Sequence, residues 1–435
     1  MTASFRMARN SLANFLAQLL SQGLRAVYVV LVGRYLSEAD FGFYSFALAI
    51  CLVVTILATL GLETILVREL AALRQDDAAR RARQRSLLGS VLAYELALSL
   101  GVCVLLWGIT LWRGEEGARQ TAFLLLGGGL ILRQLSESLM GVLRGHEHME
   151  YEVVFSAVEG LGLVGLVLVF HALGLGFMGV FWAYGLTYAL QFLIGLGFVM
   201  RVFFLPSFAG LRRDGELLAK AFPVGLARLT SSLTTNAGPL LLPLLRSELE
   251  AGIYGAAYQP LKGLFLVTRS LGIGVLPVFA QLYSAREEGS LARSVDTSVR
   301  FTTILILPLA AGLFAFPELV LRILYGAKYA AGAEALRALA VVIVLTFLNT
   351  LFTNLAIAVH RQKALGWGRA AATILNLALL LWLTPRLGPL GPALALLMGE
   401  LTLCVILALV LSGQFRRFPL FRPLARPLLA GLAMA

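Results

Sequence analysis

Twelve long apolar stretches, separated by short breaks that carry charges, constrain this chain more than any other feature. Each stretch has 17 to 26 residues, and a helix needs roughly 20 apolar residues to cross a bilayer. None shows the alternation of apolar and polar residues that a membrane β-barrel requires. We therefore predict an all-α polytopic membrane protein with about 12 transmembrane helices. The stretches are 10–33, 42–67, 87–112, 121–143, 153–170, 178–200, 221–244, 261–282, 301–317, 338–359, 364–383 and 391–413.

The composition agrees with lipid as the solvent for most of the chain. Of the 435 residues, 14% are charged and 59% are hydrophobic, with a mean hydropathy of +0.84; an ordinary soluble domain is about 25% charged. This excludes a typical cytosolic enzyme, a nucleic-acid-binding protein and a disordered chain. The three cysteines lie in separate stretches without a pairing pattern, so we expect neither a disulfide framework nor a metal site.

The distribution of Lys and Arg predicts the orientation. If the N-terminus is cytoplasmic, the inner breaks hold 22 of the 36 basic residues and the outer breaks hold eight, as the retention of positive charge on the cytoplasmic side requires. The net charge of +12 then reflects anchoring to the inner leaflet. We expect the protein to lie in the inner membrane of a bacterial or archaeal cell. The first apolar stretch is too long for the hydrophobic region of a signal peptide, so we expect it to be retained.

Two short matches at nearly one offset indicate an internal repeat. FGFYSFA at 41–47 matches AGIYGAA at 251–257, which aligns Gly42 with Gly252, and GFMGVFWA at 176–183 matches GPLGPALA at 388–395. Six stretches per half give both halves the same orientation, as in transporters built from parallel repeats. We therefore predict two six-helix lobes around a central cavity. The predicted parts are an N-lobe at 1–200, a cytoplasmic interfacial linker at 201–220, a C-lobe at 221–413 and a basic cytoplasmic tail at 414–435 that ends like the start of a thirteenth span.

Polar residues within the stretches predict a water-filled cavity, because a charge at the middle of a bilayer costs roughly 2.5 to 3.5 kcal/mol. The first stretch carries a polar face within about 120° of arc, which ends in Arg25. The first stretch of the second half repeats the pattern, beginning with Arg228. The two faces comprise Asn10, Ser11, Asn14, Gln18, Ser21, Gln22 and Arg25, and Arg228, Ser231, Ser232, Thr235 and Asn236.

Four arginines near the middle of predicted spans are candidate substrate contacts, because a guanidinium is always charged and suits bidentate binding of phosphate. They are Arg25, Arg133, Arg228 and Arg269, with Asn14, Gln18, Gln22, Ser232 and Thr235 as hydrogen-bonding partners for phosphate or sugar. Alternatively, carboxylates within the spans neutralise these arginines, and Glu137 lies four residues after Arg133, on the same helical face. The candidate ion-pair or coupling carboxylates are Glu95, Glu137, Glu159 and Glu400, whereas we interpret Glu63 as interfacial.

Several segments together resemble one family. The opening NFLAQLLSQGLRAVYVVLVGRYLSEADFGFYSFALAI, followed by GLETILVREL, and AGIYGAAYQPLKGLF, LPVFAQLYS, ILYGAKY and LNLALLLWLTPRLGPLGPALAL in the second half resemble the O-antigen-flippase-like polysaccharide and oligosaccharide-lipid flippases. These belong to the multidrug/oligosaccharidyl-lipid/polysaccharide (MOP) exporter superfamily, with the multidrug and toxin extrusion (MATE) transporters. The resemblance implies two six-helix bundles that alternate between inward- and outward-open states. It also implies polyprenyl-pyrophosphate-linked glycans as substrates.

We therefore expect a flippase that moves such a lipid-linked oligosaccharide to the outer leaflet for cell-surface polysaccharide biosynthesis. Its partners would be membrane lipids and polysaccharide assembly proteins, not nucleic acid. We expect no enzymatic activity, and no cofactor apart from a coupling H+ or Na+. One alternative is a cation-coupled multidrug exporter of the same fold, which would need a carboxylate-lined cavity. The other is an integral-membrane glycosyltransferase or polymerase, which the absence of an acidic loop site and of a large outer loop disfavours.

Overall fold

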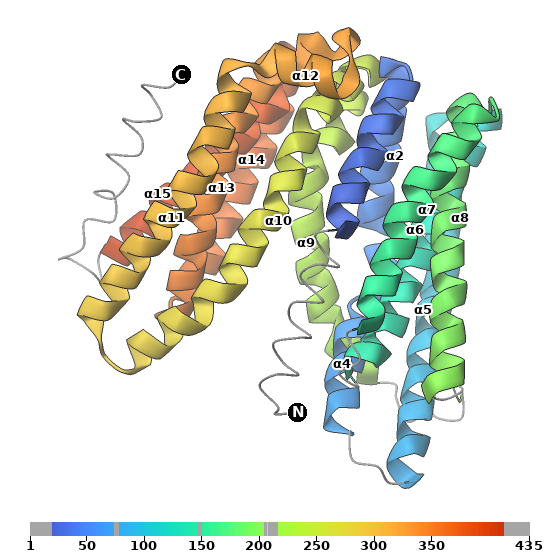
Figure 1. Ribbon diagram of the computed structural model, residues 1–435, viewed down its shortest axis with the longest axis horizontal. Helices are drawn as coiled ribbons and strands as arrows, with labels where there is room; N and C mark the ends of the chain where they lie inside the picture. The colour runs from blue at the N-terminus through green and yellow to red at the C-terminus, as the bar shows by residue number, and fades with distance from the viewer. Residues whose placement is uncertain (1–19, 74–77, 146–149, 204–206, 208–215, 413–435) are drawn as a thin grey trace. The chain divides into compact units, whose positions relative to one another are not determined.

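The computed structural model describes residues 20–73, 78–145, 150–203, 207 and 216–412, and within these ranges it contains helices and connecting turns but no β-strand. The predicted all-α membrane fold is therefore confirmed. A first helix is described over 20–35. It is followed by α2 (Glu38–Val54), α3 (Ile56–Thr59), α4 (Leu62–Ala72), α5 (Ala78–Arg113), α6 (Gly117–Gly145), α7 (Glu150–Ala172), α8 (Gly176–Phe198), the π-helix η1 (Val199–Phe203), α9 (Glu216–Leu245), α10 (Glu248–Ser284), α11 (Glu288–Ala315), α12 (Pro317–Tyr325), the 3-10 helix η3 (Ala327–Gly332), α13 (Ala333–Ala358), α14 (Gln362–Leu387) and α15 (Leu390–Ser412) (Figure 1).

Every predicted stretch coincides with helical structure in the described residues. Eight described helical segments are long and apolar enough to cross a membrane by length and composition. The helices α6, α9 and α10 are not among these eight, and they are the helices that carry Arg133, Arg228 and Lys262. The first helix is described over 20–35, which is shorter than the 18 residues required of a candidate membrane span. The count of twelve spans therefore stays a prediction.

The second predicted stretch is not one helix but the series α2, α3 and α4. The break between α3 and α4 falls at Leu60 and Gly61, whose φ angles of 48° and 83° are left-handed. A residue in this region ends a right-handed helix, and glycine adopts it without a steric cost. The start of α9 packs against this break, since a Cβ on Gly225 would lie 2.6 Å from the carbonyl oxygen of Leu60.

Packing divides the chain into two units. Unit 1 comprises Met1–Leu36 and Tyr44–Ala237, and unit 2 comprises Ser37–Phe43 and Gly238–Ala435. The beginning of α2 therefore belongs to unit 2, whereas most of α9 belongs to unit 1. The lobe boundaries at 200 and 221 were predicted from the internal repeat, whereas the two units are defined by contacts between residues. The lobe boundaries therefore stay a prediction.

Each unit has an apolar core of helix side chains. In unit 1, α4, α5, α6 and α9 bury Leu66, Leu88, Leu139 and Ala221 completely. In unit 2, the core gathers side chains of α10, α11, α13, α14 and α15, which include the buried Phe279, Leu291, Phe352, Ala372 and Leu407. Arg133 in α6 and Arg228 in α9 thus stand on helices that contribute to this core.

The two glycines that the repeat aligns lie against each other in unit 2, where α2 and α10 begin. A Cβ on Gly42 would lie 1.7 Å from the carbonyl oxygen of Glu248, and a Cβ on Gly252 would lie 2.0 Å from that of Glu38. Each glycine thus faces the residue four positions before the other glycine. An approximate two-fold axis that relates two repeats produces such a reciprocal contact.

Candidate functional site

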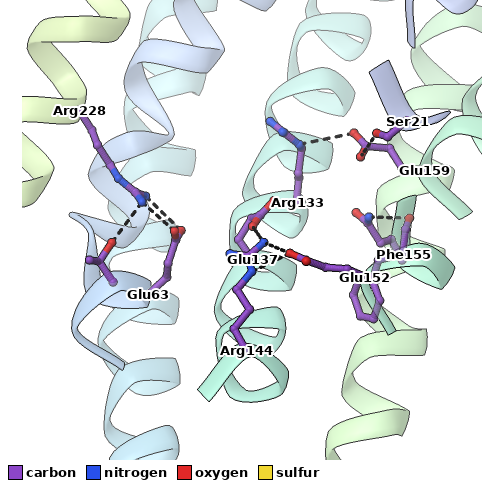
Figure 2. Close-up of polar contacts among 11 residues, drawn as sticks. Ser21, Glu63, Arg133, Glu137, Arg144, Glu152, Phe155, Glu159 and Arg228 are labelled. Carbon is purple, nitrogen blue, oxygen red and sulfur yellow. Dashed lines mark hydrogen bonds and ion pairs between the residues drawn. The ribbon is translucent and has the colours of Figure 1, made fainter. Parts of the chain in front are cut away.

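Four side chains of unit 1 converge on the carboxylate of Glu159, in α7. Arg25, from the first helix, donates a hydrogen bond to Oε1 through Nη2, and Nε of Arg133, in α6, lies 3.7 Å from the same oxygen. Tyr188, in α8, donates a 2.5 Å hydrogen bond to Oε1. Ser21 donates a 3.3 Å hydrogen bond to Oε2, and Figure 2 shows Ser21 and Arg133 on either side of Glu159. We call Arg25, Arg133 and Glu159 the arginine cluster.

The arginine cluster carries an excess of positive charge. Two guanidinium groups against one carboxylate leave a net charge of +1. The side chains of Arg25 and Arg133 are 30% and 25% exposed, whereas that of Glu159 is 10% exposed. Nε of Arg25 is buried and has no hydrogen-bond partner in the described part of the chain. Since a guanidinium has five N–H donors, both arginines keep donors for an anion while Glu159 holds them in place.

The local spacing of Arg133 and Glu137 does not produce the ion pair that it permits. Glu137 lies 3.4 Å from Arg144, which also pairs with Glu152 at 2.7 Å (Figure 2). Arg133 instead reaches Glu159 on the neighbouring helix. A spacing of four residues places two side chains on one face, but the partner of a long side chain also depends on the carboxylates that adjacent helices present.

Arg228 is held by Glu63 rather than left free for an anion. Its Nη1 and Nη2 donate hydrogen bonds of 3.0 and 2.7 Å to the two carboxylate oxygens, and Nη2 also lies 3.2 Å from Oγ1 of Thr64 (Figure 2). The interfacial position of Glu63 stays a prediction, but the residue is buried within the protein and pairs with Arg228. The break at Leu60 and Gly61 begins α4 close to α9, which brings Glu63 within reach of Arg228.

A cavity of about 340 Å³ lies next to Arg228 in unit 1, and most of its lining residues are polar, including Ser232 and Thr235, which were predicted from the sequence. We call it the α9 pocket because five of its eight lining residues belong to that helix. The lining residues are Ile56, Thr59, Gln134, Arg228, Ser231, Ser232, Thr235 and Asn236. Thr59 and Gln134 also line the pocket but were not predicted from the sequence. They belong to α3 and α6, and the polar face of one helix cannot show which residues of other helices lie beside it.

Of the other predicted substrate-binding residues, Gln22 alone has a side chain that the structure describes. Gln22 is exposed on the first helix, while Asn14 and Gln18 lie outside the described residues. Arg269 belongs to α10, but its side chain is also outside the described part.

Two carboxylates within the spans, Glu95 and Glu400, accept hydrogen bonds from neutral side chains. Glu95 is completely buried and accepts a 2.5 Å hydrogen bond from Ser138. In unit 2, Glu400 accepts a 2.7 Å hydrogen bond from Asn349. No ion pair with either carboxylate is formed by the described residues.

Comparisons with known proteins agree on one family and one fold. A family model described as "Polysaccharide biosynthesis protein" matches residues 7–283, and the MatE model matches residues 223–382. The chain is 28% identical over 313 residues to the succinoglycan biosynthesis transport protein ExoT of Rhizobium meliloti (strain 1021). That alignment covers 71% of this chain, and it spans only 60% of the length of the relative.

Solved structures of similar fold include transporters of lipid and of drugs. The lipid II flippase MurJ, in an inward closed conformation, has a TM-score of 0.73 at 14% identity and covers 98% of this chain and 91% of its own. An inward-facing multidrug resistance MATE family transporter of the MOP superfamily has a TM-score of 0.67 at 18% identity, with coverages of 96% and 98%. A MOP superfamily transporter from Pyrococcus furiosus, described by a binding pocket of reverse polarity, has a TM-score of 0.62 at 15% identity, with coverages of 94% and 95%.

Proposed function

This chain belongs to the polysaccharide biosynthesis protein family of the MOP superfamily, and on that premise we propose that it flips a polyprenyl-pyrophosphate-linked oligosaccharide. The movement runs from the cytoplasmic to the outer leaflet of the inner membrane, by alternating access, in a chain whose N-terminus is cytoplasmic. The observation that carries the proposal is the arginine cluster, whose net charge is positive within a membrane-spanning unit.

The pyrophosphate of the substrate needs cationic partners where it crosses the bilayer, because an unpaired charge is expensive there. Arg25 and Arg133 offer planar donor groups that suit phosphate oxygens. The bond from Tyr188 to Glu159 fixes the carboxylate, so the guanidinium groups are positioned before the substrate arrives. The polyprenyl chain stays in lipid during this movement, and no covalent chemistry is required.

A cation-coupled drug exporter is the second candidate, favoured by the MatE match over residues 223–382. A cationic drug would need a carboxylate without a cation partner in its binding site. The two span carboxylates without an ion pair among the described residues, Glu95 and Glu400, belong neither to the arginine cluster nor to the lining of the α9 pocket. Glu159 is shared by two arginines, and Glu63 is held by Arg228. These pairings favour an anionic substrate. We do not propose a glycosyltransferase or polymerase, because the curated relative is a transport protein.

The two candidates are distinguished by reconstitution. Purified protein in proteoliposomes should move a fluorescent polyprenyl-pyrophosphate-linked saccharide between leaflets, measured as the fraction of label that dithionite quenches over time. Protein-free vesicles and vesicles with heat-denatured protein are the controls. In the same vesicles, an imposed ion gradient should not drive ethidium transport. Ethidium transport without movement of the labelled lipid would overturn the proposal in favour of drug export.

We propose Glu95 as the residue that couples transport to H+. A fully buried carboxylate without a cation partner among the described residues is strongly disfavoured in its charged form, and its Oε2 has no hydrogen-bond partner there. Glu95→Gln should keep substrate binding but reduce flipping under a pH gradient to the rate measured without one. Glu115→Gln, which removes a buried carboxylate paired with Arg113, should retain the response. Acceleration by a Na+ gradient alone would contradict H+ coupling.

A further inference from the structure

The α9 pocket lies beside the arginine cluster but differs from it in chemistry. Gln134 lines the pocket, and it directly follows Arg133 of the cluster in α6, so the two sites use adjacent faces of one helix. The cavity volume of about 340 Å³ is within the range of roughly 300 to 1,000 Å³ that holds small-molecule ligands. The two sites can therefore contact different parts of one ligand.

The lining of the pocket combines hydroxyl and amide groups. Nδ2 of Asn236 donates hydrogen bonds of 3.0 and 3.3 Å to the carbonyl oxygen and Oγ of Ser232, which leaves the amide oxygen as an acceptor. The side chains of Ser231 and Gln134 form no hydrogen bond with the described residues, so their donors and acceptors are available. Hydroxyl and amide groups both donate and accept, which matches the hydroxyl groups of a neutral sugar.

The charge of the pocket distinguishes it from a phosphate site. Among the described residues that line it, Arg228 is the only cation, and the bidentate pair with Glu63 compensates this charge. A pyrophosphate in this pocket would meet the carboxylate of Glu63 as well as the guanidinium. In the arginine cluster, by contrast, a positive charge remains after Glu159 is counted.

We infer that the α9 pocket binds the glycan of the substrate, while the arginine cluster binds its pyrophosphate. This inference rests on the proposed flippase function, and it divides recognition of the substrate between two sites. It also replaces the expectation that Arg228 contacts the anion. Arg228 instead closes one side of the sugar site, with its orientation fixed by Glu63 and Thr64.

Binding of two probes to protein in nanodiscs tests this division. One probe is undecaprenyl pyrophosphate without sugar. The other is the polyprenyl-pyrophosphate-linked oligosaccharide extracted from cells that express this protein. Gln134→Met combined with Ser231→Ala should weaken binding of the glycolipid about tenfold, since the two substitutions remove two neutral hydrogen-bonding groups. Binding of the sugar-free probe should change less than about twofold. Arg25→Gln should weaken binding of both probes.

A matched pair on the same helix is the control. The hydroxyls of Thr230 and Thr234 bond to backbone carbonyls of α9, and neither residue lines the pocket, so Thr230→Val with Thr234→Val should leave both affinities unchanged. If the pocket variant weakens binding of both probes equally, or of neither, the assignment of glycan and pyrophosphate to separate sites is overturned, while the flippase proposal stands. If the unsubstituted protein binds neither probe, the flippase proposal itself fails.

Discussion

Replacing Arg25 and Arg133 together by Gln should weaken binding of a polyprenyl pyrophosphate by at least about 100-fold and abolish its flipping in proteoliposomes. A hydrogen bond to a charged group contributes about 1.5 to 3 kcal/mol, and tenfold in affinity corresponds to about 1.4 kcal/mol. Two lost contacts therefore suffice. Binding is measured on protein in nanodiscs, and flipping by the dithionite assay.

The double variant leaves Glu159 without a cation, and an uncompensated charge of this kind costs about 3 to 5 kcal/mol. A third substitution, Glu159→Gln, removes that charge, so the triple variant should accumulate better than the double variant but should still fail to bind. Arg113→Gln is a matched control, because Arg113 also forms a pair with a buried carboxylate, that of Glu115, at 3.1 Å. A triple variant that flips at the original rate would refute the role of the cluster.

The helices themselves could be predicted because lipid imposes a length and a composition on each span. The division of the second stretch into α2, α3 and α4 could not. The residues around Leu60 and Gly61 are as apolar as their neighbours, so hydropathy shows no interruption. The break depends on left-handed backbone angles and on the close approach of Gly225 to Leu60, and both are tertiary features.

The candidate site could be predicted as a set of residues but not as a set of pairs. A mid-span arginine is a signal by itself, since its cost in lipid requires a function or a partner. Which carboxylate pairs with it depends on the packing of distant segments: Glu159 is 134 positions from Arg25, and Glu63 is 165 positions from Arg228. The spacing of four residues indicated Glu137 as the partner of Arg133, because the sequence shows which residues share a helical face but not which residues of other helices lie nearby.

The reciprocal glycine contact of unit 2 predicts the largest effect on stability. Gly252→Ala should destabilise the protein by about 3 kcal/mol, at the upper end of what overpacking costs. The added Cβ would lie 2.0 Å from the carbonyl oxygen of Glu38, and a backbone atom cannot turn away as a flexible side chain can. The loss of stability is measured as a decrease in the thermal midpoint of the detergent-solubilised protein, which is followed by size-exclusion chromatography after heating.

A second glycine of α10 supplies a control of opposite sign. A Cβ on Gly263 would meet no heavy atom within 4 Å, so Gly263→Ala should stabilise the helix by about 0.5 to 1 kcal/mol. Gly42→Ala should resemble Gly252→Ala, because its Cβ would lie 1.7 Å from the carbonyl oxygen of Glu248. The double variant should cost less than the sum of the two, since one added methyl group already separates the helices at the shared contact. Additive losses would mean that the two glycines do not share one contact.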